Sequence, residues 1–356
     1  MRKCGLDEIR HAPAALKDLD YALIIDECMM IGSEKLLPVL AVPAEHQGHP
    51  LQLNDVKVVG VNVRSGWTAK TASEALDGSI EAVGKKPSYI ISDNDSKMRK
   101  AVGLSNYTWH RDISHTLAMF MERVYKDDAD FVDFNKKMAT CKQQHCMREA
   151  AYLQSPSQRT KARFMNLSEC VRWADKMLRI FHKLGRREQE VFSFLRPYAS
   201  FVDEMKEMVS CIQFIETRMK HNGLSKNTIA ECRRHVCATV MCGNDRMRRV
   251  GQQILDYLAK EKFLLKDNET INNSSDIIES TFGIFKYRQS PNKLNGVTAR
   301  VLHLPVILAY AGESASKNYN VKERLCRTKI MDINLWRDEN LMENLVAKRI
   351  QTLKTA

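Results

Sequence analysis

The sequence lacks the features that mark membrane, secreted and nucleotide-using proteins. No apolar run approaches the ~20 residues that a helix needs to cross a bilayer, and the first 20 residues have no continuous apolar core like that of a secretory signal. The ten cysteines are scattered through 356 residues, too sparse to staple a small fold with disulfides. No Gly-rich G-x-x-x-x-G-K-[ST] loop is present. We therefore expect a cytoplasmic protein with reduced cysteines and no nucleotide cofactor.

What the sequence does contain is an excess of positive charge. Lys and Arg total 55 against 43 Asp and Glu, which gives a formal net charge of +12. Such a surplus favours a polyanionic partner, because Lys and Arg release counterions when they neutralise phosphates. Hydrophobic residues make up 44% of the chain, enough for a real core, so the composition is not that of a disordered protein.

Four short runs of β-branched and other apolar residues, and a fifth run with the sequence YTWHRDI, predict β-strands in the first part of the chain. They cover residues 21–26, 36–42, 56–63, 89–92 and 107–113. Pro38 interrupts the second run, which either weakens this prediction or indicates an edge strand, because proline cannot donate to a strand ladder.

Helical periodicity alternates with the later runs. Apolar residues recur at helical spacing over 68–83 and 115–125, and Asp95 or Ser96 can cap a shorter helix that ends at Val102. The predicted order is therefore β-β-β-α-β-α-β-α. Three consecutive strands followed by alternating helices and strands indicate an α/β fold whose mixed five-stranded sheet begins with an antiparallel meander. This order matches the RNase H-like fold.

The rest of the chain reads as helix. Residues 127–270 are rich in Lys, Arg, Glu, Met and Leu and contain few strand-like runs, so we expect a large all-α insertion. Further helices are expected over 276–287, 298–310 and 321–354. We therefore divide the chain into five segments. Residues 1–20 form an N-terminal lead segment, 21–126 and 271–311 form the two parts of an α/β domain, 127–270 form the insertion between them, and 312–356 form a helical C-terminal tail.

Three carboxylates stand where this fold would bring chemistry together. Asp26 follows the first strand, Asp93 follows the fourth, and Glu279 lies on the helix over 276–287. In an RNase H-like sheet the first and fourth strands are neighbours, so the two aspartates would face each other at corresponding strand ends. Taken singly, each of the three is more simply explained as a cap, a turn residue or a solvated helix position. Their order on these elements is what points to a site.

Phosphodiester cleavage would need such carboxylates. An attacking oxygen must be activated and a leaving oxygen stabilised in line with it, and two Mg²⁺ ions about 3.5–4 Å apart can serve both oxygens. Mg²⁺ prefers oxygen ligands and keeps several waters, so a few well-placed carboxylates suffice, and Mn²⁺ can substitute. The pattern therefore predicts that Asp26, Asp93 and Glu279 are both metal ligands and catalytic residues.

Four sequence blocks resemble those of bacterial insertion-sequence transposases of the DDE class. They are IIDE at 24–27, IISDND at 90–95, RDISH at 111–115 and DIIESTFGIFK at 276–286. The resemblance covers residues from about 20 to about 310, and the last block is the most specific. It implies a retroviral-integrase-like fold, Asp26, Asp93 and Glu279 as ligands of two Mg²⁺ ions, cleavage at transposon ends, and strand transfer into target DNA. It also implies a nucleoid-associated protein that forms a homodimer when two ends are synapsed.

Several neighbouring residues remain as alternatives or additions to this site. Asp95 is the main rival of Asp93, whereas Glu27 should point to the opposite sheet face from Asp26. Asp112 and His115 form a D-x-x-H pair that either supports the site near DNA or serves packing and capping.

The resemblance also implies DNA contacts. Basic residues that follow the Glu in this family contact the transposon-end backbone, and the corresponding residues here are Lys286, Tyr287 and Arg288, with His115 as a further candidate. Arginines at 186–187, 233–234 and 246–249 would suit a DNA groove in the insertion. Trp173 could stack on a base, although a core position explains it better. The spacing of the Cys and His residues does not favour a zinc site.

Two other functions fit the same residues. One is a DNA-binding protein that descends from a transposase without its activity, and the other is an RNase H-like nuclease that cuts without joining strands. Transposases of this kind normally carry an end-recognition domain before the first strand, but only about 20 residues precede Tyr21 here. End recognition is therefore expected in the insertion, in the tail or in a separate chain, unless the sequence is a fragment.

Overall fold

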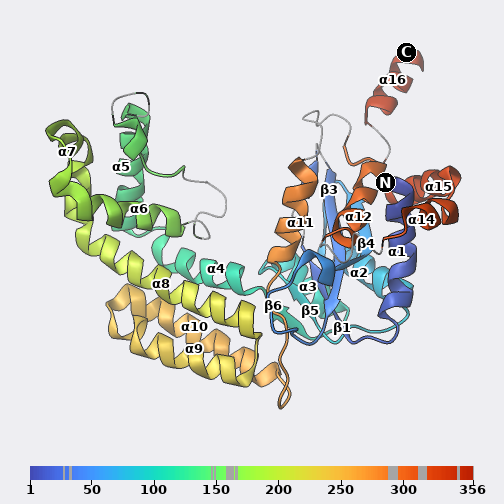
Figure 1. The fold of residues 1–356 in the computed structure, drawn as a ribbon, viewed down its shortest axis with the longest axis horizontal. Helices are drawn as coiled ribbons and strands as arrows, with labels where there is room; N and C mark the ends of the chain where they lie inside the picture. The colour runs from blue at the N-terminus through green and yellow to red at the C-terminus, as the bar shows by residue number, and fades with distance from the viewer. Residues whose placement is uncertain are drawn as a thin grey trace. The chain divides into compact units, whose positions relative to one another are not determined.

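A computed structural model gives the fold of the chain (Figure 1). It describes all residues except 27–28, 32–33, 146, 148–149, 158–163, 165–166, 288–295, 312–318, 343–344 and 356. The chain divides into two compact units, which we call the sheet unit and the helical unit. The sheet unit comprises residues 1–112, 220–224 and 269–356, and the helical unit comprises 113–219 and 225–268.

The sheet unit is built on a mixed, open β-sheet. Its strands are β1 (Tyr21–Ile25), β2 (Met29–Ile31), β3 (Glu34–Pro43), β4 (Lys57–Arg64), β5 (Ile90–Ser92) and β6 (Trp109–Arg111). β3 pairs antiparallel with β4 on one side and with β1 and β2 on the other, and β1, β5 and β6 run parallel. The path across the sheet is therefore β4-β3-β1-β5-β6. The predicted α/β class, with a mixed sheet that begins as an antiparallel meander, is confirmed, but the described sheet has six strands and not the five expected.

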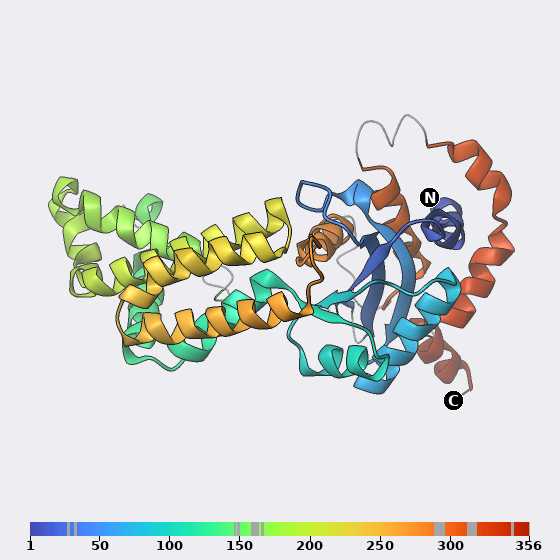
Figure 2. The same cartoon turned by 90° about the horizontal axis from the view of Figure 1, so that it is seen from below.

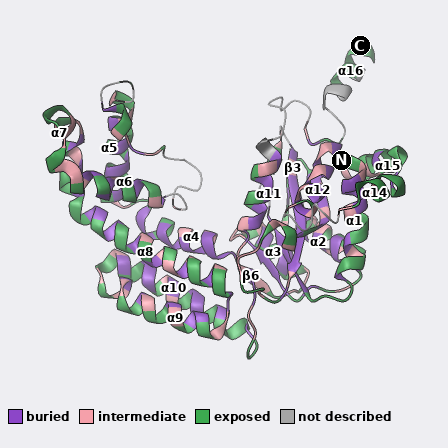
Figure 3. Ribbon diagram, viewed as in Figure 1, coloured by how far each residue is buried: buried purple, intermediate pink, exposed green. Residues whose placement is uncertain are grey.

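β1 lies in the centre of the sheet, and its residues are buried accordingly. All five of its residues, YALII, are buried, as expected for a strand covered on both faces (Figure 3). β3 is also buried along most of its length and has partners on both sides, so the prediction that Pro38 marks an edge strand is wrong. Pro38 lies opposite Val61 of β4, and on its other side it falls between the segments that pair with β1 and with β2. At such a gap a missing N–H costs no ladder bond.

Helices cover both faces of the sheet. One core cluster joins alternate residues of β1, β3 and β4 to the apolar sides of α1 (Arg2–Leu16), α2 (Ala69–Val83) and α3 (Ser96–Leu104). The cluster does not include α11 (Asp276–Tyr287), which lies on the other side of the sheet from α3 (Figure 2).

Local sequence signals set the ends of two of these helices. Thr68 caps α2 by accepting the N–H of Thr71, and Asp95 caps α3 by accepting the N–H of Lys97. α2 ends at Gly84, whose backbone φ of +74° suits glycine. These boundaries agree with the sequence prediction.

The remaining elements of the sheet unit are η1 and a series of C-terminal helices. Their bounds are η1 (Leu53–Asp55), η7 (Ala299–Leu302), α12 (His303–Ala309), α14 (Val321–Arg327), α15 (Ile330–Asn340) and α16 (Leu345–Thr355). Leu6 of α1, Leu302 and Ile333 form a second, smaller core cluster with Ala299. The lead segment is thus a packed helix, which the sequence reading did not foresee, and the helix expected over 321–354 is divided into α14, α15 and α16.

The described residues of the helical unit form helices and turns and no strand. The elements are α4 (Ile113–Tyr125), α5 (Ala129–His145), η2 (Ala151–Leu153), α6 (Leu167–Ile180), η3 (Phe181–Lys183), α7 (Arg186–Phe192), η4 (Ser193–Tyr198), α8 (Ala199–Asn222), α9 (Lys226–Ala238), η5 (Val240–Cys242) and α10 (Asp245–Leu264). α4 and α9 both pack against α10. None of the helices described in either unit combines the length and apolar character needed to cross a membrane.

Candidate functional site

Two of the predicted carboxylates meet at one edge of the sheet. β1 and β5 pair in parallel, and the last pair of this ladder joins Ile25 to Ser92. Asp26 and Asp93 each follow by one residue, so they occupy adjacent positions at the carboxyl-terminal edge of neighbouring strands, which lie about 4.8 Å apart in a sheet. Asp26 is only 6% exposed and Asp93 is half-buried. The prediction that the first and fourth predicted strands are neighbours is confirmed.

The register also predicts the sheet face of these two side chains. Ile24 pairs with Ile91, and both are fully buried. Neither belongs to the cluster that packs on α2 and α3, whereas Ile25 and Ile90 do. Because side chains alternate along a strand, the positions of Asp26 and Asp93 share the face of Ile24 and Ile91. This is the side of the sheet on which α11 lies (Figure 2).

Asp95, the alternative to Asp93 as the site residue, caps a helix. Its Oδ1 accepts the backbone N–H of Lys97 at 2.6 Å and so caps α3. Its own N–H donates to Oδ1 of Asp93 at 3.1 Å, which helps to fix the Asp93 carboxylate. The geometry therefore favours Asp93 as the site residue and Asp95 as a structural one.

Asp112 connects this edge to α11. The residue is fully buried, and its N–H donates to the carbonyl oxygen of Ser92 at 2.9 Å. Its Oδ2 accepts the N–H of Ser275, directly before α11, at 2.6 Å. A single side chain thus holds the start of α11 beside the ends of β5 and β6. Of the two roles considered for Asp112, capping is the one that the structure supports.

The segment before α11 is held at a second place. The Tyr89 hydroxyl donates to the carbonyl oxygen of Ala44 at 2.7 Å and accepts the N–H of Asn272 at 3.0 Å. The Asn272 amide donates to the carbonyl oxygen of Pro43 at 2.9 Å. Burial raises the pKa of Tyr89 well above its usual value, so this hydroxyl stays protonated and can donate. Residues 272–275 therefore follow a fixed path along the sheet.

Glu279 lies on α11, outside the strand ladder that aligns the two aspartates. It is exposed on α11, four residues after Ser275, which corresponds to about 6 Å along the helix axis. Among the residues that the structure describes, no three His, Cys, Asp or Glu side chains are close enough to hold a metal ion together. The structure thus brings Asp26 and Asp93 together and places the helix of Glu279 at the same edge, without closing the three carboxylates into one cluster.

The predicted DNA contacts lie in different parts of the chain. Lys286 and Tyr287 end α11, but their side chains lie outside the described structure, as does Arg288 altogether. Glu27 also lies outside the described residues. His115 is a half-buried residue of α4 in the helical unit.

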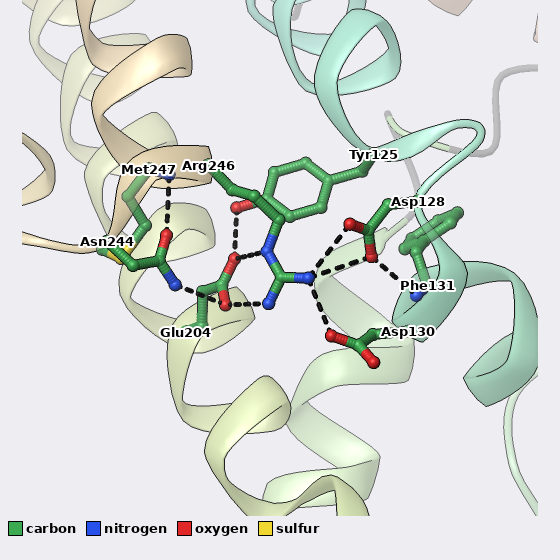
Figure 4. A network of polar contacts seen from close by, with 8 residues as sticks. All are labelled: Tyr125, Asp128, Asp130, Phe131, Glu204, Asn244, Arg246 and Met247. Atoms are coloured by element: carbon green, nitrogen blue, oxygen red, sulfur yellow. Dashed lines mark hydrogen bonds and ion pairs between the residues drawn. The ribbon is translucent and has the colours of Figure 1, made fainter.

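Arg246 of the helical unit does not have the role expected from sequence. Its guanidinium binds Glu204 through Nη2 at 2.6 Å and Asp128 and Asp130 through Nη1 at 3.0 and 2.8 Å (Figure 4). The Tyr125 hydroxyl donates to Glu204 at 2.7 Å, and these acids raise the pKa of Arg246. A guanidinium with three carboxylate partners is an internal cross-link, so the prediction that Arg246 contributes to a DNA groove is wrong.

Trp173 is likewise structural. Its Nε1 donates to the carbonyl oxygen of Leu153 at 2.8 Å, and its ring packs edge-on against Phe192 at a centroid distance of 6.2 Å. These contacts give Trp173 a packing role and not a base-stacking one. This agrees with the core position that the sequence favoured.

Comparisons with known proteins add no assignment. No model of a known protein family matches this chain. A comparison with curated proteins likewise finds no match.

Proposed function

We propose that this chain is the catalytic protein of a DDE-type DNA transposase, with an RNase H-like sheet unit and the helical unit as its all-α insertion. The observation that carries this proposal is the register that sets Asp26 beside Asp93 at the ends of parallel strands. The sheet path β4-β3-β1-β5-β6, with an antiparallel meander followed by parallel strands, is the arrangement expected of that fold. The helical unit lies in the chain between Asp93 and Glu279, as the resemblance implies.

The donor set suits Mg²⁺. Asp26, Asp93 and Glu279 would hold the ions, because carboxylate oxygens are the ligands that Mg²⁺ and Mn²⁺ prefer. When bound, two such ions activate the attacking oxygen and stabilise the leaving oxygen of a phosphodiester. Two carboxylates at adjacent register positions would attract a divalent cation, whose charge offsets their mutual repulsion.

The other side chains of the sheet edge position these carboxylates. Asp95 donates its N–H to Asp93, and Asp112 holds the start of α11, so that Glu279 lies one helical turn from the edge. Glu279 is exposed on its helix, and a change of rotamer moves its carboxylate by several ångströms, on the order of the length of the side chain. In such a rotamer Glu279 would supply the third carboxylate of the donor set.

DNA is the substrate that best fits the charge. The net charge of +12 favours a polyanion, and the activity proposed requires both transposon ends and target DNA. Two ends must be cut together, so we propose a homodimer in the complex that synapses them. Strand transfer distinguishes this function from that of a simple nuclease.

A supercoiled plasmid that carries the DNA flanking the gene tests the proposal. We expect nicking that depends on Mg²⁺ or Mn²⁺ and falls by about 10³-fold or more in Asp26→Asn and Asp93→Asn, which corresponds to at least ~4 kcal/mol of barrier. Asp95→Asn is the matched control, because asparagine caps a helix as well as aspartate does. Equal nicking by wild type and Asp26→Asn would overturn the catalytic role. Joining of the cut end to a second plasmid separates a transposase from a nuclease.

A second candidate, which the net charge of +12 also fits, is a DNA-binding descendant of a transposase that no longer cuts. This protein would bind the plasmid with no divalent-dependent nicking, and Glu279→Gln would leave every measured property unchanged. A loss of nicking in Glu279→Gln decides for the enzyme.

A further inference from the structure

A cluster of two arginines around one tryptophan lies at the strand that pairs with β5, whose end is followed by Asp93. Trp109 begins β6, Arg111 ends it, and Arg99 lies on α3. The guanidinium carbon of Arg111 is 5.3 Å from the centre of the indole, and that of Arg99 is 5.8 Å from it. Trp109 is half-buried and packs against the core under α3, so its ring is a fixed support for two mobile side chains.

Hydrogen bonds tie this support to the edge that carries Asp93. The Trp109 Nε1 donates to Oγ of Ser92 at 2.8 Å, and the Ser92 hydroxyl donates to the carbonyl oxygen of Asp93 at 3.0 Å. Arg111 is the register partner of Ser92. A ligand held by Arg111 would therefore lie one strand away from the residue that precedes Asp93.

The surroundings of these two arginines differ from those of Arg246, which has three acidic partners. Arg99 is exposed and Arg111 is half-exposed, and among the residues that the structure describes neither forms an ion pair with a carboxylate. The structure shows contacts between their guanidinium groups and the face of the indole ring. Such contacts use the guanidinium plane, so the N–H donors along its edge can bind other groups. Guanidinium groups of this kind bind phosphate oxygens in a planar, two-pronged geometry.

We propose that Arg99 and Arg111, supported by Trp109, bind backbone phosphates of the DNA strand that enters the site. This inference rests on the proposed function for its choice of DNA. Because Trp109 and Arg111 share the sheet face of Ile90 and Ser92, the cluster lies on the α3 side, whereas the Asp26 and Asp93 positions belong to the other face. The cluster would therefore bind phosphates of the DNA other than the scissile one.

Binding of a fluorescent DNA duplex by the full chain, measured by anisotropy without divalent ions over a range of salt, tests this proposal. In Arg99→Gln/Arg111→Gln we expect affinity to fall about 10-fold or more and the slope of log K against log salt to shrink by about 1.8, since each phosphate contact contributes ~0.9. Trp109→Leu keeps both charges but removes their support, and a smaller loss of affinity is expected.

The matched control is Arg64→Gln. Arg64 is exposed at the end of β4, with its guanidinium carbon 5.6 Å from the centre of the Trp67 ring, so the substitution removes the same charge from the same kind of contact. β3, β1 and β5 separate β4 from β6. An equal loss of affinity in Arg64→Gln, or an unchanged salt slope in the double variant, would overturn the proposal. Thermal unfolding checks that each variant is folded.

The outcome is separable from that of the proposed function. Binding without divalent ions needs no catalysis, so a wild-type chain that never nicks can still lose affinity and salt slope in Arg99→Gln/Arg111→Gln. Conversely, metal-dependent nicking together with unchanged binding in that variant would sustain the enzyme and refute the phosphate site.

Discussion

The two units of this protein arrange their acidic side chains differently. In the helical unit, Asp128, Asp130 and Glu204 surround the guanidinium of Arg246, which binds all three carboxylates. In the sheet unit, the register of β1 and β5 sets Asp26 beside Asp93, so that two like charges share one edge. The first arrangement cross-links a helical bundle, and the second would suit a divalent cation, whose charge offsets repulsion between neighbouring carboxylates.

The largest loss of stability is expected from substitution of Arg246, which would remove the cross-link of the helical unit. Arg246→Ala leaves the nearly buried Glu204 without its partner, and we expect the helical unit to lose roughly 3–5 kcal/mol of stability. Urea unfolding followed by circular dichroism measures the loss. Arg246→Lys should lose less, because lysine keeps the charge without the two-pronged geometry. A change below about 1 kcal/mol in Arg246→Ala would show that the network contributes little.

Asp112 tests whether one side chain holds α11 to the sheet. Asp112→Ala leaves the buried N–H of Ser275 without its acceptor, and we expect about 1–3 kcal/mol of destabilisation and a clear loss of nicking. Asp112→Asn keeps an acceptor oxygen and should recover most of both. Hydrogen exchange at residues 275–279 gives a direct readout, and unchanged protection in Asp112→Ala would contradict the role assigned to this residue.

Removal of one charge from each unit sharpens the comparison. In buffer without divalent ions, Asp26→Asn should stabilise the protein by roughly 0.5–1 kcal/mol, because like charges at adjacent strand positions repel. Glu204→Gln should destabilise it, because the charge on Arg246 loses its main partner. Thermal unfolding in the presence of a chelator compares the two, and a lower stability of Asp26→Asn than of wild type would mean that the aspartates do not repel.

The smallest effect concerns the thiols of the helical unit. Burial raises the pKa of Cys211 to about 11 and that of Cys232 to about 12, so few thiolates form near pH 8. Cys237 and Cys242 are exposed. Iodoacetamide followed by mass spectrometry should label the exposed pair first and reach the buried pair only as the protein unfolds. Rapid labelling of Cys232 would show that α9 opens in the folded state.

Much of the sheet unit could be predicted from sequence because its signals are local. Strand runs, the caps at Thr68 and Asp95, and α11 at 276–287 all depend on neighbouring residues. The adjacency of Asp26 and Asp93 followed from the order of strands. β2 escaped prediction because three residues give too short a pattern, and α1 did because Pro13 lies within it.

The contacts that depend on tertiary structure were not predictable in this way. Arg246 was interpreted as a DNA-groove arginine, because nothing near it in sequence shows that Asp128, from the turn before α5, and Glu204, from α8, meet it. The bond from Ser275 to Asp112 joins residues 163 positions apart, so the RDISH block indicated a capping role as one alternative but not which segment is capped.

The most direct test of the central claim is to locate Mn²⁺ by anomalous diffraction in crystals of the full chain. The account predicts a peak within ligand distance of both Asp26 and Asp93, with Glu279 turned toward it, and no peak in crystals of Asp26→Asn. Strong Mn²⁺ peaks elsewhere, with the aspartate pair empty at saturating metal, would contradict it.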